Sequence, residues 1–126
     1  MAVIGIGIDV VPVTRVEEIL GKHGDRALKR LFTPGEIERA RDLKYQALHL
    51  SGRLAAKEAA YKALSGDEEA RGIGWKEIEV ESLADGRPTL RFHGKAAARY
   101  AALGATRSHL SLTHAGGIAA AVVVLE

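Results

Sequence analysis

The sequence predicts an α+β fold in which a mainly antiparallel sheet packs against helices. Three observations support this prediction. The chain begins with alternating residues at 3–11, has helical periodicity at 50–64, and ends with two apolar segments at 111–114 and 118–125 joined by a glycine-rich turn. With 126 residues and no internal repeat or linker, the chain is expected to form a single domain, residues 1–126.

The first expected strand, residues 3–11, has two unlike faces. One face carries four branched apolar side chains, Ile4, Ile6, Ile8 and Val10. The other face carries Gly5, Gly7 and Asp9. Because glycine weakens a strand, two glycines on one face suggest that a ligand or another backbone approaches closely beside Asp9. The alternative is that a helix packs tightly over the glycines and Asp9 merely ends the strand at a turn.

Helices are expected in the middle of the chain. Thr14 has capping-box spacing and starts a helix that Gly24 helps to end. A short basic helix follows at 26–31, and Thr33 then repeats the capping signal with proline at the first helical position. The third helix reaches Leu64 and stops near Gly66.

The remaining elements are expected to be short. Residues 66–74 are predicted to form a loop, because they are rich in glycine and charge. Strands at 78–81 and 89–92 are joined by a turn at Asp85 and Gly86, and an alanine-rich helix at 95–103 precedes the final hairpin.

The third helix carries charges where its apolar pattern does not favour them. Its buried stripe is expected to contain Leu50, Leu54, Tyr61 and Leu64. Lys57 projects into the middle of this stripe, Glu58 lies at its edge, and Lys62 follows one turn later. A charged group in such a place should be paired, metal-bound or used chemically. The alternative is a Glu58–Lys62 surface pair worth only about 0.2–0.5 kcal/mol.

A third segment of interest lies at the end of the expected strand 111–114. Thr113 and His114 occupy this strand end, where their side chains can reach an anion. A single histidine is more often an ordinary hydrogen-bonded or exposed residue than a functional one, so His114 alone would not define a site.

Together, these segments resemble one family. They are Gly5 to Asp9, Arg53 to Lys62, the turn at Asp85 to Pro88, and Ser111 to His114. Their order and separation resemble the holo-acyl-carrier-protein synthases, the small stand-alone class of 4'-phosphopantetheinyl transferases. Leu54 stands where the family usually has an aromatic residue, and Arg87 where lysine is common. Neither departure removes a residue that the chemistry needs.

The resemblance implies the 4'-phosphopantetheinyl transferase fold and a Mg²⁺-dependent reaction in fatty acid biosynthesis. The enzyme would transfer 4'-phosphopantetheine from coenzyme A to a serine of apo-acyl-carrier protein and release 3',5'-ADP. Asp9 and Glu58 would hold Mg²⁺, which prefers hard oxygen ligands, and Lys62 would stabilise phosphate charge or assist proton transfer. These three are the expected catalytic residues. The expected coenzyme A contacts are Arg53, Lys57, Lys62, Thr113 and His114.

The net charge of +2 is unevenly spread. Residues 21–53 contain eight basic and four acidic residues, a local balance of +4 that would attract an acidic partner. The resemblance implies acyl-carrier-protein contacts at Arg15, Lys22 and Arg26. No nucleic-acid partner is expected, because the segment has no aromatic stacking platform and no recognisable binding motif. The alternative is a merely solvated helix face.

Two other function classes remain open: a non-enzymatic basic module that binds an acidic protein, and a nucleotide-phosphate hydrolase that uses the same metal site. The segment 118–125 is apolar on both faces, which favours oligomerisation because both faces should be covered. The resemblance implies a homotrimer with active sites at subunit interfaces. The chain has no cysteine, no signal-peptide pattern and no apolar run of membrane-spanning length, so a soluble, cytoplasmic protein without a membrane partner is expected.

Overall fold

A computed structural model gives the fold and describes residues 2–64 and 72–126. In chain order the elements are β1 (Gly5–Pro12), α1 (Val13–Leu31), α2 (Pro34–Ala40), α3 (Gln46–Leu64), the 3₁₀ helix η2 (Trp75–Glu77), β2 (Ile78–Ser82), β3 (Pro88–Phe92), α4 (Gly94–Ala102), β4 (Ser108–Ala115) and β5 (Ile118–Leu125). All strand pairs in these residues are antiparallel. The predicted α+β class is therefore confirmed.

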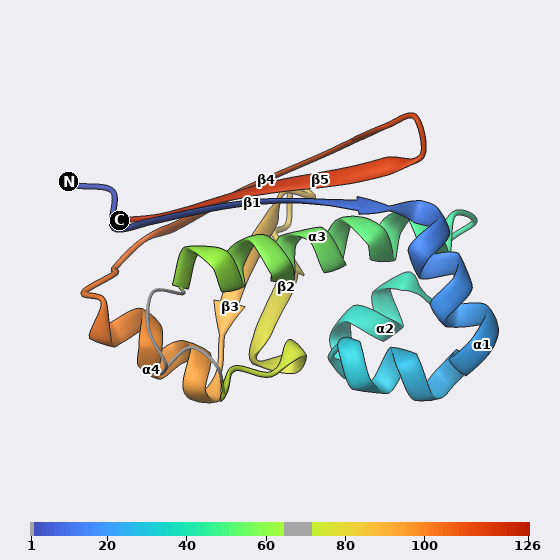
Figure 1. Ribbon diagram of the computed structural model, residues 1–126, viewed down its shortest axis with the longest axis horizontal. Helices are drawn as coiled ribbons and strands as arrows, with labels where there is room; N and C mark the ends of the chain where they lie inside the picture. Colours follow the sequence, from blue (N-terminus) through green and yellow to red (C-terminus); the bar gives the residue numbers. More distant parts are fainter. Residues whose placement is uncertain (1, 65–71) are drawn as a thin grey trace.

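Three strands form the larger sheet, in the order β1-β5-β4, and β2 pairs with β3 in a separate hairpin. The register places Ile8 opposite Val122, and Asp9 opposite Ala121. Figure 1 shows the three-stranded sheet along one side of α3 and α1, α2 and α4 on the other side, while the β2–β3 hairpin runs past α3 up to the sheet, where β3 contacts β4. Helix α3 is thus the central element, and it contacts both layers.

The glycine face of β1 packs directly on α3. A Cβ atom added to Gly7 would overlap the carbonyl oxygen of Ala59, and one added to Gly5 would overlap that of Ala63. Another backbone therefore approaches the two glycines closely, and it belongs to a helix, as in the alternative interpretation of this face. Asp9 does not end the strand at a turn, because β1 continues to Pro12.

Of the two capping boxes predicted from the sequence, at Thr14 and at Thr33, the structure contains only the second. Helix α1 begins at Val13 with Pro12 as its N-cap and no side-chain cap bond, so the predicted Thr14 cap is wrong. At α2, Thr33 Oγ1 accepts a hydrogen bond from the Glu36 amide at 3.2 Å, and the Glu36 side chain accepts one from the Thr33 amide at 2.8 Å. The capping box at Thr33 is confirmed. It also brings the Glu36 carboxylate into the interior.

The helix break predicted at Gly24 is confirmed, with φ 50° and ψ −129° at this glycine inside α1. In the stripe of α3, Leu50, Leu54 and Leu64 are buried as predicted. Tyr61 is not: its side chain is exposed, because it faces a pocket and not the sheet. The predicted end of the helix near Gly66 lies outside the described residues.

The sheet face that points away from α3 is apolar. No described element covers it in Figure 1. Its exposed side chains include Ile6 and Ile8, each 65% exposed, and Val10, which is 52% exposed. Within residues 2–64 and 72–126, no helix combines the length and the apolar character needed to cross a bilayer.

Candidate active site

The fold brings the two predicted carboxylates together. Asp9 from the middle of β1 and Glu58 from α3 line one pocket of about 440 Å³, which we call the carboxylate pocket. The other residues that line it are Lys57, Tyr61, Lys62, Ile73, Gly74, Trp75 and Ile78. We call residues 73–78, which approach the carboxylates from a different part of the chain, the pocket wall.

Each carboxylate has a basic side chain beside it. Lys62 Nζ lies 2.8 Å from Asp9 Oδ1 and donates a second hydrogen bond to the Ile8 carbonyl at 3.1 Å. Arg15 Nη2 lies 3.1 Å from Glu58 Oε1. The Asp9 and Glu58 side chains are only 15% and 18% exposed, so both carboxylates are largely removed from water. Segments far apart in the sequence thus converge on one charged centre.

The two carboxyl groups differ in acidity. Burial and then the neighbouring Asp9 raise the pKa of Glu58 to about 7, although Arg15 opposes the rise. Burial would also raise the pKa of Asp9. The side-chain hydrogen bonds with Glu58 and Lys62, together with the positive charge of Lys62, outweigh burial and hold the pKa of Asp9 below its ordinary value. Near neutral pH the pair therefore carries one full negative charge and a fraction of a second.

This pair fits a magnesium ion. Oδ2 of Asp9 is buried and has no hydrogen-bond partner among the described residues, so one oxygen is left for another ligand. The described chain contains no cluster of three or more histidine, cysteine or acidic side chains suited to a metal. Two carboxylates are enough for Mg²⁺, which completes its octahedron with water and substrate phosphates.

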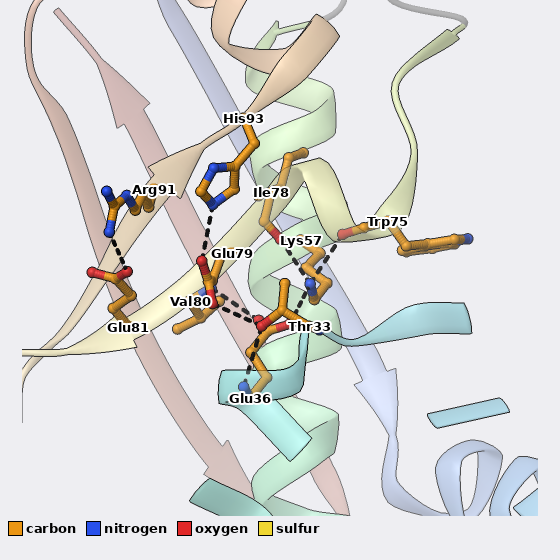
Figure 2. A network of polar contacts seen from close by, with 10 residues as sticks. All are labelled: Thr33, Glu36, Lys57, Trp75, Ile78, Glu79, Val80, Glu81, Arg91 and His93. Atoms are coloured by element: carbon orange, nitrogen blue, oxygen red, sulfur yellow. Dashed lines mark hydrogen bonds and ion pairs between the residues drawn. The ribbon is translucent and has the colours of Figure 1, made fainter. Parts of the chain in front are cut away.

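Lys57 differs from its predicted role. Its side chain is only 1% exposed, and Nζ lies 2.7 Å from Glu36 Oε1. It also donates hydrogen bonds to the carbonyls of Trp75 at 3.0 Å and Ile78 at 2.7 Å, as Figure 2 shows. Burial lowers the pKa of Lys57, and Glu36 opposes this effect. The structure does not support the expectation that Lys57 binds a coenzyme A phosphate, because all three ammonium donors have acceptors inside the protein.

The other predicted anion-binding residues lie elsewhere. Arg53, Thr113 and His114 line a second pocket of about 500 Å³, which we call the Arg53 pocket. It shares no lining residue with the carboxylate pocket within the described chain. Sequence reasoning missed His49, which also lines the Arg53 pocket. Burial, and then Arg53 and Arg39, lower the pKa of His49 to about 4, so this histidine is neutral at physiological pH.

Arg53 also borders a third pocket beside the β2–β3 turn, where Arg87 and His109 are among the lining residues. The Arg53 guanidinium donates a long hydrogen bond, 3.4 Å, to Ser82 Oγ. Arg53 therefore lies between two open pockets, and its positive charge is available to anions in either of them.

The predicted carrier contacts all lie on α1. Arg15, Lys22 and Arg26 are exposed on this helix, and Gly24 breaks the helix between the second and third of them. Arg15 is the one that reaches the site, through Glu58. The three basic residues are thus spread along α1, with Arg15 beside the carboxylate pocket.

Comparisons with known proteins agree with this geometry. Residues 5–123 match the family model of the 4'-phosphopantetheinyl transferase superfamily. A holo-acyl-carrier-protein synthase of Nitratidesulfovibrio vulgaris is 49% identical over 124 residues, which cover 98% of each chain. The crystal structure of the holo-acyl-carrier-protein synthase from Neisseria meningitidis matches with a TM-score of 0.86 at 26% identity, over 99% of both chains.

A further relative was solved with a ligand. The holo-acyl-carrier-protein synthase of Helicobacter pylori, in complex with coenzyme A, matches with a TM-score of 0.80 at 26% identity. The match covers 96% of this chain and 99% of that one. Profile, sequence and fold all point to the same family over nearly the full length. The chain therefore belongs to the holo-acyl-carrier-protein synthases of the 4'-phosphopantetheinyl transferase superfamily.

Proposed function

We propose that this chain transfers 4'-phosphopantetheine from coenzyme A to a serine of apo-acyl-carrier protein in a Mg²⁺-dependent reaction. The serine oxygen attacks the β-phosphorus of coenzyme A and gives up its proton to water, the phosphoanhydride bond breaks, and 3',5'-ADP leaves with the electron pair. The observation that carries the proposal is the buried Asp9–Glu58 pair, with its unpartnered oxygen and Lys62 beside it. The family resemblance further implies the cytoplasm and fatty acid biosynthesis as the setting.

The roles follow from the positions of the side chains. Asp9 and Glu58 would hold Mg²⁺, which when bound supplies Lewis-acid polarisation of a phosphoryl oxygen. Lys62 is half-exposed beside Asp9 and would neutralise charge on the phosphate under attack. Arg53, Thr113 and His114 would bind other phosphate oxygens of coenzyme A in the Arg53 pocket. No protein nucleophile is needed, because the work is positioning and charge stabilisation.

The proposal includes a homotrimer with sites at subunit interfaces. Two observations support it. The carboxylate pocket and the Arg53 pocket are separate within one chain, and the outer face of the sheet is apolar and exposed. A neighbouring copy on that face would cover it, and it could bring its own Arg53 pocket toward the carboxylates of the first chain.

A direct assay tests the proposed function. The purified chain is incubated with coenzyme A and apo-acyl-carrier protein, with Mg²⁺ or with a chelator, and the carrier is analysed by intact-protein mass spectrometry. We expect a phosphopantetheine adduct on serine in the presence of Mg²⁺ and none after chelation. Release of 3',5'-ADP with an unmodified carrier would indicate a hydrolase instead. Carrier binding without turnover would indicate a basic binding module.

Charge reversal tests the carrier-binding face. Lys22→Glu and Arg26→Glu are expected to raise the KM for the carrier about tenfold and leave that for coenzyme A nearly unchanged. Both residues are exposed on α1, so steering by charge is the effect they lose. Added salt should weaken the wild-type interaction, since exposed charges are screened over about 8 Å at physiological ionic strength.

Two further variants complete this test. Arg107→Glu is the matched control, because Arg107 is an exposed basic residue that lies outside α1, just before β4. Arg15→Glu is less informative, because Arg15 contacts Glu58 and its reversal would also disturb the carboxylate pocket. Carrier kinetics that stay unchanged in Lys22→Glu and Arg26→Glu would leave these side chains as solvated surface.

A further inference from the structure

The buried Lys57 ammonium connects the pocket wall to the helices behind it. Lys57 lies on α3 one residue before Glu58, and its Nζ is buried against the Glu36 carboxylate. Two of its three acceptors are the carbonyls of Trp75 and Ile78, which belong to the wall. Figure 2 shows these carbonyls directed at Nζ, while the Trp75 ring extends in another direction. One side chain of α3 therefore fixes two points of the wall.

Glu36 completes the arrangement from the N-terminus of α2. One of its oxygens contacts Lys57 at 2.7 Å and accepts the Thr33 amide at 2.8 Å. The other accepts the amide of Val80 in β2 at 2.9 Å. The carboxylate is nearly inaccessible, since Glu36 is only 3% exposed. The wall is thus held from α2, from α3 and from β2 through one buried ion pair.

Stability alone does not account for such a pair. Taking two charges out of water carries a large desolvation penalty, and apolar replacements of a buried pair are often neutral or stabilising. Apolar side chains would fill the same space, but they would offer no donor to the Trp75 and Ile78 carbonyls. The distinctive effect of Lys57 is therefore the placement of these two residues opposite Asp9 and Glu58.

We propose that Lys57, neutralised by Glu36, is a positioning residue that holds the pocket wall at a fixed distance from the two carboxylates and so sets the affinity for coenzyme A. The effect on coenzyme A rests on the proposed function, whereas the effect on the wall does not. Lys57 touches no substrate in this role. It acts through Trp75 and Ile78.

Three variants separate positioning from stability. Lys57→Met removes the donor and leaves Glu36 buried without its cation, so it is expected to be strongly destabilised. The double variant Lys57→Met with Glu36→Gln removes both charges and is expected to recover the fold, while the wall carbonyls still lack their donor. The control, Glu79→Gln, alters the same polar network through Thr33 and His93 and leaves the bonds from Lys57 to the two wall carbonyls in place.

Trp75 provides a readout that needs no ligand, because it is the only tryptophan in the chain. Acrylamide quenching of its fluorescence is expected to rise about twofold in the double variant, as in a segment that opens locally. The KM for coenzyme A should rise about tenfold with little change in kcat, because a displaced wall weakens binding. A smaller folded fraction would instead lower the apparent kcat at unchanged KM. Glu79→Gln should resemble the wild type in both readouts.

The outcomes are distinct. Wild-type quenching in a stable double variant would show that the pair only balances charge, and would overturn the proposal. A double variant that fails to fold would overturn it too, since the pair would then be needed for the fold as a whole. If the wild type has no transferase activity, the proposed function fails, but Trp75 quenching still decides whether Lys57 holds the wall.

Discussion

Replacing Asp9 by asparagine, or Glu58 by glutamine, is expected to reduce phosphopantetheine transfer by roughly 10³-fold while leaving the fold intact. Each change keeps the side-chain volume and removes one negative charge from the pocket, where the proposal places Mg²⁺. Tryptophan fluorescence titrated with Mg²⁺ should show weaker metal binding in both variants, because Trp75 lines the same pocket. Near-normal turnover of either variant at limiting Mg²⁺ would exclude that residue from the metal site.

Glu58→Gln also has a pH signature in the metal-free protein. The pKa of Glu58 is raised to about 7 from 4.5, so the folded state disfavours the ionised form. Native stability is therefore lost as the pH rises from about 4.5 through 7, and glutamine removes this loss. In chelator, Glu58→Gln should melt above the wild type at pH 8 and close to it at pH 5. An equal difference at both values would contradict the raised pKa.

A surface carboxylate supplies the control for both measurements. Glu81 lies on β2 and pairs with Arg91 through exposed side chains, away from the carboxylate pocket. Glu81→Gln removes the same formal charge and is expected to change neither turnover nor Mg²⁺ affinity, since exposed pairs contribute about 0–1 kcal/mol. Loss of activity in this control would show that overall charge, and not the site, is responsible.

The carboxylate pair could be predicted because its placement depends on local periodicity. Strand alternation fixes the face on which Asp9 lies, and helical spacing fixes the side of α3 from which Glu58 and Lys62 project. The glycines of β1 indicated that another backbone would lie close to that face. Once α3 packs on the glycines, the strand and helix charges must meet at the rim of the same contact.

The partners of Lys57 could not be predicted in this way. Periodicity placed Lys57 in the apolar stripe and indicated that it needed a partner, but not which one. Glu36 is 21 residues away in sequence and enters the interior because the capping box turns its side chain back toward Thr33. The two carbonyl acceptors, from Trp75 and Ile78, carry no side-chain signature at all. Long-range backbone contacts of this kind leave no pattern in a single sequence.

The exposure of Tyr61 is a second feature that the periodicity of the sequence did not predict. Its helical spacing from Leu54 and Leu64 matches the buried stripe, yet the pocket opens on that side of α3 and leaves the ring exposed. The separation of the Arg53 pocket from the carboxylate pocket could not be predicted from the sequence either. The sequence motifs indicated both the carboxylates and Arg53 as site residues. Whether they line one pocket or two depends on how the sheet packs across α3.

The uncovered face of the three-stranded sheet gives the other large expected effect. If the proposed oligomer forms, Ile8→Asp should convert it into an inactive lower oligomer that keeps its fold. Ile8 is 65% exposed and lies opposite Val122 in the register, so both side chains belong to the outer face. A contiguous apolar face on a globular protein marks an interaction site, and a buried charge without a partner would disrupt it. Val122→Asp should act in the same way.

The neighbouring residue of β5 separates assembly from folding. Val123 is fully buried on the inner face, against the core around α3, so Val123→Asp should unfold the chain and not merely dissociate it. Ala98→Asp is the exposed control, because Ala98 is exposed on α4 and lines none of the three pockets described above. Analytical ultracentrifugation measures the assembly of each variant, circular dichroism its fold, and the transfer assay its activity. A wild-type chain that is fully active as a monomer, or an Ile8→Asp variant of wild-type size and activity, would refute the interface. If dissociation and loss of activity coincide in Ile8→Asp while the fold survives, the catalytic unit is larger than one chain, which agrees with the proposed trimer.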